Sequence, residues 1–147
     1  MIVTDDSSVD TSLITGTLGL NPSRIHKKGD TRVGTHTGLI GIRPRTVWAM
    51  DSEWTIREDE TVSHHIEFFK SILLPKFDIL KQYKDDNKFE LSFWIWIQTD
   101  SSGIEISLSE DELAFLEKLA NNVRFALLGN DSEIAGIEAY RSEMHIG

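Results

Sequence analysis

The sequence predicts a single α+β domain, with an antiparallel or mixed sheet of about 5–6 strands and about three helices packed on it. Three observations support this fold class. Helical periodicity and capping signals mark the helices, one long segment alternates apolar and polar residues as a strand does, and short β-branched runs lie between them. The length of 147 residues suits one domain, and no linker or internal repeat is visible, so residues 1–147 are treated as one unit.

The first predicted helix covers Thr11 to Leu18 and follows a short apolar start at Ile2–Val3. Asp10 is a good N-cap because its carboxylate can accept the free N–H groups of the first turn. Gly19 is a natural stop because glycine adopts the left-handed conformation without steric cost. Gly16 weakens the helix interior by about 1 kcal/mol relative to alanine.

The next segment, residues 24–45, is rich in glycine, threonine and basic side chains and predicts a loop with an irregular edge strand. A strand is expected at Thr46–Met50. The second helix is expected over Thr61–Lys84, where apolar residues recur at three- and four-residue spacing. Pro75 lies inside it and removes a backbone donor, so the sequence predicts either one bent helix or two consecutive helices.

The clearest predicted strand runs from Lys88 to Gln98, with aromatic and aliphatic residues alternating onto one face. A hairpin loop at Thr99–Gly103 and a partner strand at Ile104–Leu108 are expected to follow. The third helix opens with Ser109-Glu110-Asp111-Glu112, which matches the S-x-x-E capping box. A final strand is predicted at Val123–Leu128, and the alternative is a helix that continues to Gly129. The remaining residues, 130–147, form a C-terminal extension with a short helix expected near Ile134–Tyr140.

The charge balance favours a basic partner. The chain has 24 acidic and 15 basic residues, a formal net charge of −9, so phosphate backbones and anionic membranes would on average be repelled. Direct nucleic-acid or membrane binding is therefore not expected. The distribution is uneven, because residues 24–45 are mainly basic and residues 99–112 are acidic. The chain has no cysteine, and its first residues show no signal peptide, which together predict a cytoplasmic location.

A set of motifs resembles a bacterial domain-of-unknown-function family, number 4279. It comprises Leu18-Gly19-Leu20-Asn21-Pro22-Ser23, then Lys28-Gly29, Trp48-Ala49-Met50-Asp51-Ser52, Leu73-Leu74-Pro75 and Leu108-Ser109-Glu110-Asp111-Glu112-Leu113. The resemblance covers about residues 9–128 and implies an α+β domain with packed helices. It transfers no catalytic residue. Small acidic families of this kind often resemble immunity proteins, which neutralise a toxin.

Motifs for catalysis and cofactors are missing. The sequence has no G-x-S-x-G elbow, no cysteine nucleophile and no phosphate-binding loop, so neither a catalytic residue nor a cofactor is expected. His64 and His65 are adjacent and point about 100° apart on a helix, which suits a surface pair better than a metal site. An anion could still bind the basic segment, and Arg32, Arg43 and Arg45 are the candidates for this alternative.

Trp94 and Trp96 share the strand face opposite its main apolar side. A strand that is apolar on both faces usually lies centrally, which favours burial under a helix. The alternative is an aromatic platform for a partner, since tryptophan is enriched at interface hot spots.

We expect a non-enzymatic immunity or toxin-neutralising protein, or an inhibitor of a nucleic-acid-binding enzyme that acts by charge mimicry. The predicted contact residues are Glu105, Glu110, Asp111, Glu112, Trp94 and Trp96.

Overall fold

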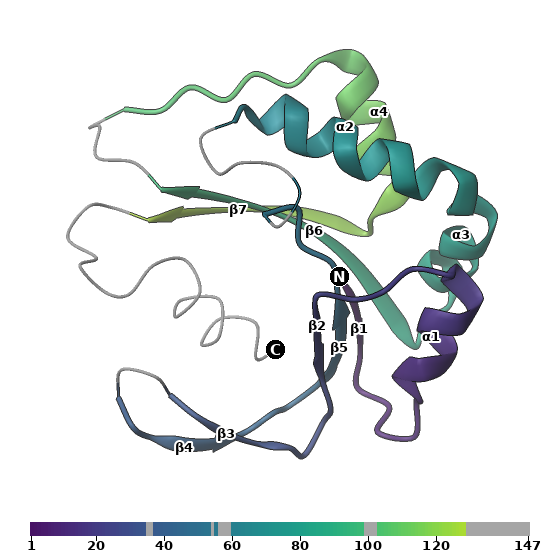
Figure 1. Cartoon of the computed structure of the whole chain (residues 1–147), viewed down its shortest axis with the longest axis vertical. Helices are drawn as coiled ribbons and strands as arrows, with labels where there is room; N and C mark the ends of the chain where they lie inside the picture. Colours follow the sequence, from purple (N-terminus) through teal and green to yellow (C-terminus); the bar gives the residue numbers. More distant parts are fainter. Residues whose placement is uncertain (35–36, 54, 56–59, 99–102, 129–147) are drawn as a thin grey trace.

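A five-stranded mixed sheet forms the centre of the computed structural model (Figure 1). The structure describes residues 1–34, 37–53, 55, 60–98 and 103–128. The strand order is β2-β5-β1-β6-β7, and the bounds in that order are Arg24–His26, Thr46–Ala49, Ile2–Thr4, Phe89–Gln98 and Asn122–Leu128. All neighbours are antiparallel except β6 and β7, which are parallel and connected through helix α4, Glu110–Leu119. The predicted α+β class is therefore confirmed.

The helices cover one face of this sheet (Figure 1). They are α1 (Thr11–Leu18), α2 (Val62–Leu73), α3 (Phe77–Asp85) and α4, with a short 3₁₀ turn, η1 (Leu74–Lys76), between α2 and α3. Apolar side chains from all four helices meet those of β1, β5 and β6 in one core. Its buried members are Ile2, Ile14, Leu18, Trp48, Ile66, Leu73, Leu80, Leu91, Phe93, Ile95, Phe115, Leu116, Leu119 and Ala120.

The predicted helix ends are confirmed at both α1 and α4. The backbone N–H of Ser12 donates to the Asp10 carboxylate at 2.9 Å, and Gly19 ends α1 at φ 65°. Ser109 and Glu112 form the predicted capping box at the start of α4. Pro75 lies in η1, so the second helical region is two consecutive helices rather than one bent helix. The final strand also forms as predicted, because α4 ends at Leu119 and β7 follows.

The predicted hairpin after β6 is wrong. Residues Ile104 to Leu108 form no strand, and β6 pairs instead with β7 from Ser92 to Gln98 and with β1 at Phe89–Leu91. Alternating apolar residues show that a segment is extended but not which strand it joins. The predicted loop at 99–103 lies outside the described residues apart from Gly103, and so does the expected helix at Ile134–Tyr140.

Residues 24–45 contain more regular structure than the sequence predicted. Strand β2 forms one edge of the main sheet, while β3 (Thr31–Val33) and β4 (Ile40–Ile42) pair with each other as a separate two-stranded sheet. In Figure 1 this hairpin extends from β2 and β5, away from the helices. Among the residues that the structure describes, no helix has the length and apolar character needed to cross a membrane.

Candidate partner-binding site

The start of α4 is positioned by its capping box. The Glu112 carboxylate accepts a hydrogen bond from the Ser109 backbone N–H at 2.7 Å, and the Ser109 hydroxyl oxygen accepts one from the Glu112 N–H at 3.2 Å. A further hydrogen bond with Ser63 on α2 is the largest cause that lowers the pKa of Glu112. Glu112, predicted as a contact residue, is therefore half-buried and used to cap α4 and hold it against α2.

The other predicted acidic residues are presented to solvent. Glu105, Glu110 and Asp111 are exposed, and within the described part of the chain none of them forms an ion pair. Glu110 and Asp111 occupy the first turn of α4, where the helix dipole stabilises negative charge. Among the described residues these carboxylates therefore carry negative charge without an ion-pair partner.

Two large apolar side chains lie beside these carboxylates in the sequence and are also exposed. Ile104 precedes Glu105 and is 39% exposed, and Leu113, one helical turn after Glu110, is 53% exposed. Protein interfaces combine an apolar centre with a polar, solvent-accessible rim. We call Ile104, Glu105, Glu110, Asp111 and Leu113 the acidic surface.

Trp94 and Trp96 lie on the other side of the sheet. Their neighbours in the strand, Phe93 and Ile95, point into the core beneath the helices, so both tryptophans project from the opposite face. The two rings stack with centroids 5.2 Å apart, and the guanidinium of Arg124 lies 5.2 Å from the centre of the Trp94 ring. Both side chains are half-buried.

The tryptophans and the acidic surface therefore lie on opposite faces of the sheet. The described helices do not cover Trp94 and Trp96, because all of them pack on the other face. The sheet separates two groups of residues that were predicted to act together.

Arg45, a candidate for anion binding, forms ion pairs within the protein. Its guanidinium lies 3.2 Å from Asp5 and 3.5 Å from Glu90. The Glu90 carboxylate also accepts hydrogen bonds from Asn122, Ser92 and Arg124, at 2.9, 2.8 and 3.3 Å. The Asn122 bond is the largest cause that lowers the pKa of Glu90. Arg45 therefore joins the chain before β5 to β6 and to the segment after β1.

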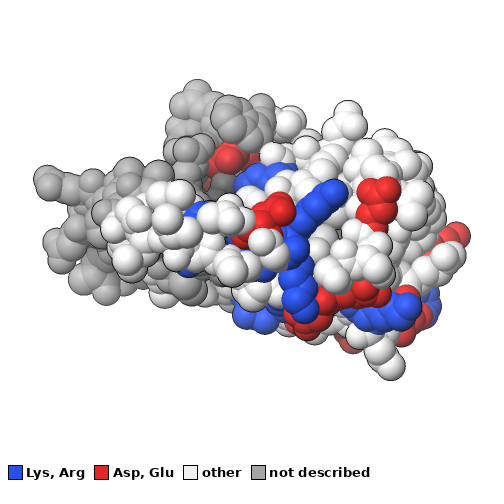
Figure 2. All heavy atoms as spheres, turned by 90° about the horizontal axis from the view of Figure 1, so that it is seen from below, with Lys and Arg blue, Asp and Glu red and all other residues white. Residues whose placement is uncertain are grey.

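Arg32 and Arg43 are the other two candidates for anion binding. Arg32 lies in β3 and Arg43 directly follows β4, and the charge of Arg43 acts on nearby His26, as Arg24 acts on Arg43. Burial, followed by the charges of Arg32 and Arg24, lowers the pKa of Arg43. Burial, followed by Arg43 and Arg24, likewise lowers the pKa of His26. On the face of the molecule seen from below, Lys and Arg side chains lie side by side with Asp and Glu, so the visible basic residues form no continuous field (Figure 2).

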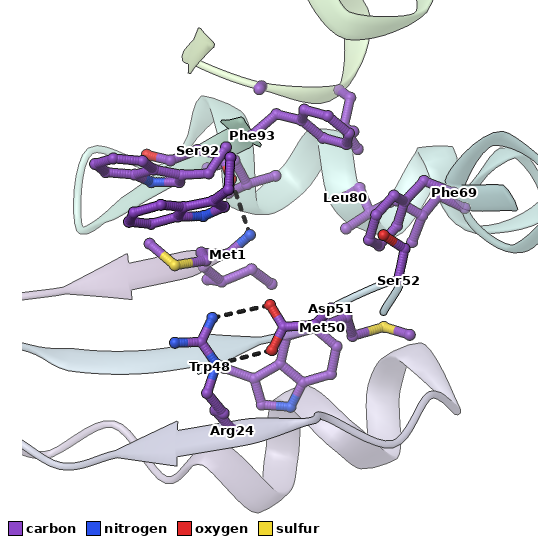
Figure 3. Close-up of a pocket in the computed structure, with 17 residues that line it drawn as sticks. Met1, Arg24, Trp48, Met50, Asp51, Ser52, Phe69, Leu80, Ser92 and Phe93 are labelled. Carbon is purple, nitrogen blue, oxygen red and sulfur yellow. Dashed lines mark hydrogen bonds and ion pairs between the residues drawn. The ribbon is translucent and has the colours of Figure 1, made fainter. Parts of the chain in front are cut away.

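A cavity of about 90 Å³ lies beside the start of β1 (Figure 3). Trp94 and Trp96 are among the residues that line it, but sequence reasoning did not indicate the cavity. On one wall the Arg24 guanidinium donates two hydrogen bonds to the largely buried Asp51, at 2.8 and 2.9 Å. Ser52 also lines the cavity, and its hydroxyl lies 2.7 Å from Nδ1 of His65 on α2. The space holds only a few water molecules. Arg24 and Asp51 are 27 residues apart, so no local motif could have indicated their pairing.

The histidine pair does not form a metal site among the described residues. Nδ1 of His64 lies 2.6 Å from the Glu60 carboxylate on the helix surface, whereas His65 points to Ser52. No group of three or more potential metal ligands occurs in the part of the chain that the structure describes.

The structure therefore defines this chain as an α+β domain with a mixed sheet, one helical layer and the surfaces described above. The family model "Domain of unknown function (DUF4279)" matches residues 1–130, and the chain belongs to this family. The resemblance read from the sequence is thereby confirmed. No curated protein and no solved structure matches the chain.

Proposed function

We propose that this chain is a non-catalytic, cytoplasmic protein-binding domain that neutralises a basic protein, as an immunity protein neutralises a toxin. The observation that supports this proposal is the acidic surface. Its three exposed carboxylates lack ion pairs within the described residues, and two exposed apolar side chains accompany them.

Such a surface suits fast recognition of a basic protein. Carboxylates at the rim of an interface attract the partner over distance and increase the association rate. Ile104 and Leu113 then provide apolar area that leaves water when the partner binds. In this proposal Leu113 takes the anchoring role first given to Trp94 and Trp96, which lie on the opposite sheet face.

The test is co-expression with the product of the neighbouring gene, comparing two variants with equal loss of charge. The surface variant combines Glu105→Gln, Glu110→Gln and Asp111→Asn. The control variant combines Glu67→Gln, Asp78→Asn and Glu117→Gln, which are exposed residues elsewhere on the helical layer.

The wild-type chain and the control variant should restore growth and co-purify with the gene product, and the surface variant should do neither. Equal rescue by all three proteins would contradict the proposal, as would the absence of any complex with the wild-type chain.

The charge-mimic alternative uses the same surface and differs only in its target. Inhibition of a nucleic-acid-binding enzyme by the wild-type chain, but not by the surface variant, would favour the charge-mimic alternative.

The anion-binding alternative has less support, because Arg45 already pairs with Asp5 and Glu90. A saturable heat shift with nucleotides or sugar phosphates that is lost in Arg43→Ala would favour that alternative.

A further inference from the structure

The cavity beside the start of β1 has a wall that is mainly apolar and aromatic (Figure 3). Three of the chain's four tryptophans, Trp48, Trp94 and Trp96, line it, together with Phe69 on α2 and Leu80 on α3. Side chains from both faces of the sheet contribute, because Trp48 belongs to the core under the helices and the other two tryptophans project from the opposite face. Such a lining favours an apolar group as the occupant.

The polar part of the wall is an ion pair without net charge. The Arg24 guanidinium donates to both oxygens of the Asp51 carboxylate, at 2.8 and 2.9 Å. The Asp51 side chain is only 9% exposed. A guanidinium has more N–H donors than these two, and no acceptor for the others occurs in the part of the chain that the structure describes. Arg24 can therefore donate a hydrogen bond to a ligand while Asp51 balances its charge.

The cavity and the ion pair both lower the stability of the fold. A cavity among apolar side chains forfeits packing contacts that a filled core makes. A buried ion pair is often less stable than well-packed apolar residues of similar volume. Departures of this kind are expected where a fold serves a function. Their occurrence at one place favours a binding site over a packing defect.

We infer that this cavity binds the short acyl group of a small uncharged amide, ester or ketone, whose carbonyl oxygen accepts a hydrogen bond from Arg24. The volume gives the size, because an engineered cavity of about 150 Å³ in another protein binds benzene, so this one encloses about four non-hydrogen atoms. Arg24 gives the polarity, because a group that only donates needs an acceptor. Asp51 excludes a net charge, because it repels a second carboxylate and its guanidinium partner repels an ammonium group.

The remainder of a longer ligand can lie outside the cavity. The Arg24 side chain is partly exposed, and Trp94 and Trp96 are half-buried, so this end of the cavity borders the protein surface. The site shares no residue with the acidic surface. It therefore stands or fails independently of the proposed function.

Tryptophan fluorescence tests the inference, because three of the four tryptophans line the cavity. The probe is 2-methylpropanamide, which joins an isopropyl group to an uncharged carbonyl. At constant ionic strength and pH 7 it should change the emission saturably, with a Kd on the order of 1–10 mM. The charged analogues 2-methylpropanoate and 2-methylpropylammonium have a similar shape, and each should bind at least about 10-fold more weakly.

A matched pair of variants tests the location. Ala120 and Ala126 are 8% and 9% exposed, and only Ala120 lines the cavity. Ala120→Leu fills the cavity and should weaken amide binding by at least about 10-fold, whereas Ala126→Leu should bind like the wild type. Leu80→Phe fills the cavity from another wall and should act like Ala120→Leu, which keeps the test valid if one variant fails to fold. Circular dichroism checks the folding of all three variants.

Three results would overturn the inference. The first is the absence of any saturable change with the amide, because water alone would then occupy the cavity. The second is binding of the carboxylate or the ammonium compound as tight as that of the amide, which would contradict an uncharged ligand. The third is undiminished amide binding by folded Ala120→Leu and Leu80→Phe, which would place the ligand elsewhere.

Discussion

At the scale of single residues, Glu90 shows how a polar network joins strands that meet from distant parts of the sequence. Its carboxylate receives hydrogen bonds from Asn122 and Arg124 on β7 and lies in an ion pair with Arg45 before β5. All of these interactions stabilise the ionised form, and they lower the pKa of Glu90 in the folded state.

Glu90→Gln should therefore destabilise the protein at pH 7 by about 1 kcal/mol, because the amide loses the charge-assisted bonds. The folded pKa lies below the unfolded value of about 4.3. The contribution of Glu90 is thus complete above that value and is lost as the pH falls through the folded pKa.

Urea unfolding of both proteins at pH 7 and near pH 3 measures this effect. The difference in unfolding free energy between wild type and Glu90→Gln should narrow at the acidic pH. A difference that stays constant or grows on acidification would show that the ionised carboxylate is not stabilised by its neighbours.

The first turn of α4 separates a structural carboxylate from exposed ones. Glu112→Ala removes the bonds to Ser109 and Ser63 and should lower the unfolding free energy by about 1 kcal/mol. Glu110→Ala removes an exposed side chain and should change it by less than about 0.5 kcal/mol. Thermal unfolding of the two variants compares them, and equal losses of stability would contradict this division of roles.

At the scale of secondary-structure elements, α1 offers a matched pair of glycines. Gly16 lies inside the helix with no atom within 4 Å of an added Cβ, so Gly16→Ala should stabilise the protein by about 1 kcal/mol. Gly19 ends the helix at φ 65°, so Gly19→Ala should destabilise it by about 1 kcal/mol, although an added Cβ meets only Nζ of Lys76 at 3.6 Å. Denaturant titrations of both variants should show shifts of opposite sign, and shifts of the same sign would contradict the account.

Local signals made the helices and single strands predictable, whereas strand pairing was not predictable. Asp10, Gly19, Pro75 and the capping box act within a few residues, and the structure confirms each of them. The pairing of β6 with β7 is set by the packing of α4 on the sheet, and alternation at Ile104–Leu108 could not indicate it. Residues 24–45 were predicted to contain one irregular edge strand, and β2 is an edge strand of the main sheet. The separate pair β3 and β4 was not predicted, and each of these strands has only three residues.

The candidate site was predictable only in part, because sequence patterns indicate local structure but not which distant segments come together. Sequence showed that Glu105, Glu110 and Asp111 cluster along the chain and that Glu112 belongs to a capping box, but not that Glu112 also bonds to Ser63 on α2. Trp94 and Trp96 lie in β6, and alternation correctly predicted that they share the face opposite Phe93 and Ile95. The sequence did not show that all four described helices pack on that other face. The cavity wall of Arg24 and Asp51 joins distant segments and gave no sequence signal.

At the scale of the whole molecule, the sheet divides surfaces of different character. The helical side carries the acidic surface, while the other side carries the stacked tryptophans and leads to the arginines of the hairpin region. The net charge of −9 favours basic partners, and we propose that the acidic surface is where such a partner binds. The account therefore predicts that binding depends on these carboxylates rather than on net charge alone.

The most direct test is the association rate of the purified chain with the neighbouring gene product, measured by stopped flow at low and high salt. For the wild type and the control variant, the rate constant should fall by about 10-fold or more between 50 mM and 500 mM salt. For the surface variant it should already be low at 50 mM salt and change little. Equal rate constants and equal salt dependence for the surface and control variants would contradict recognition through the acidic surface.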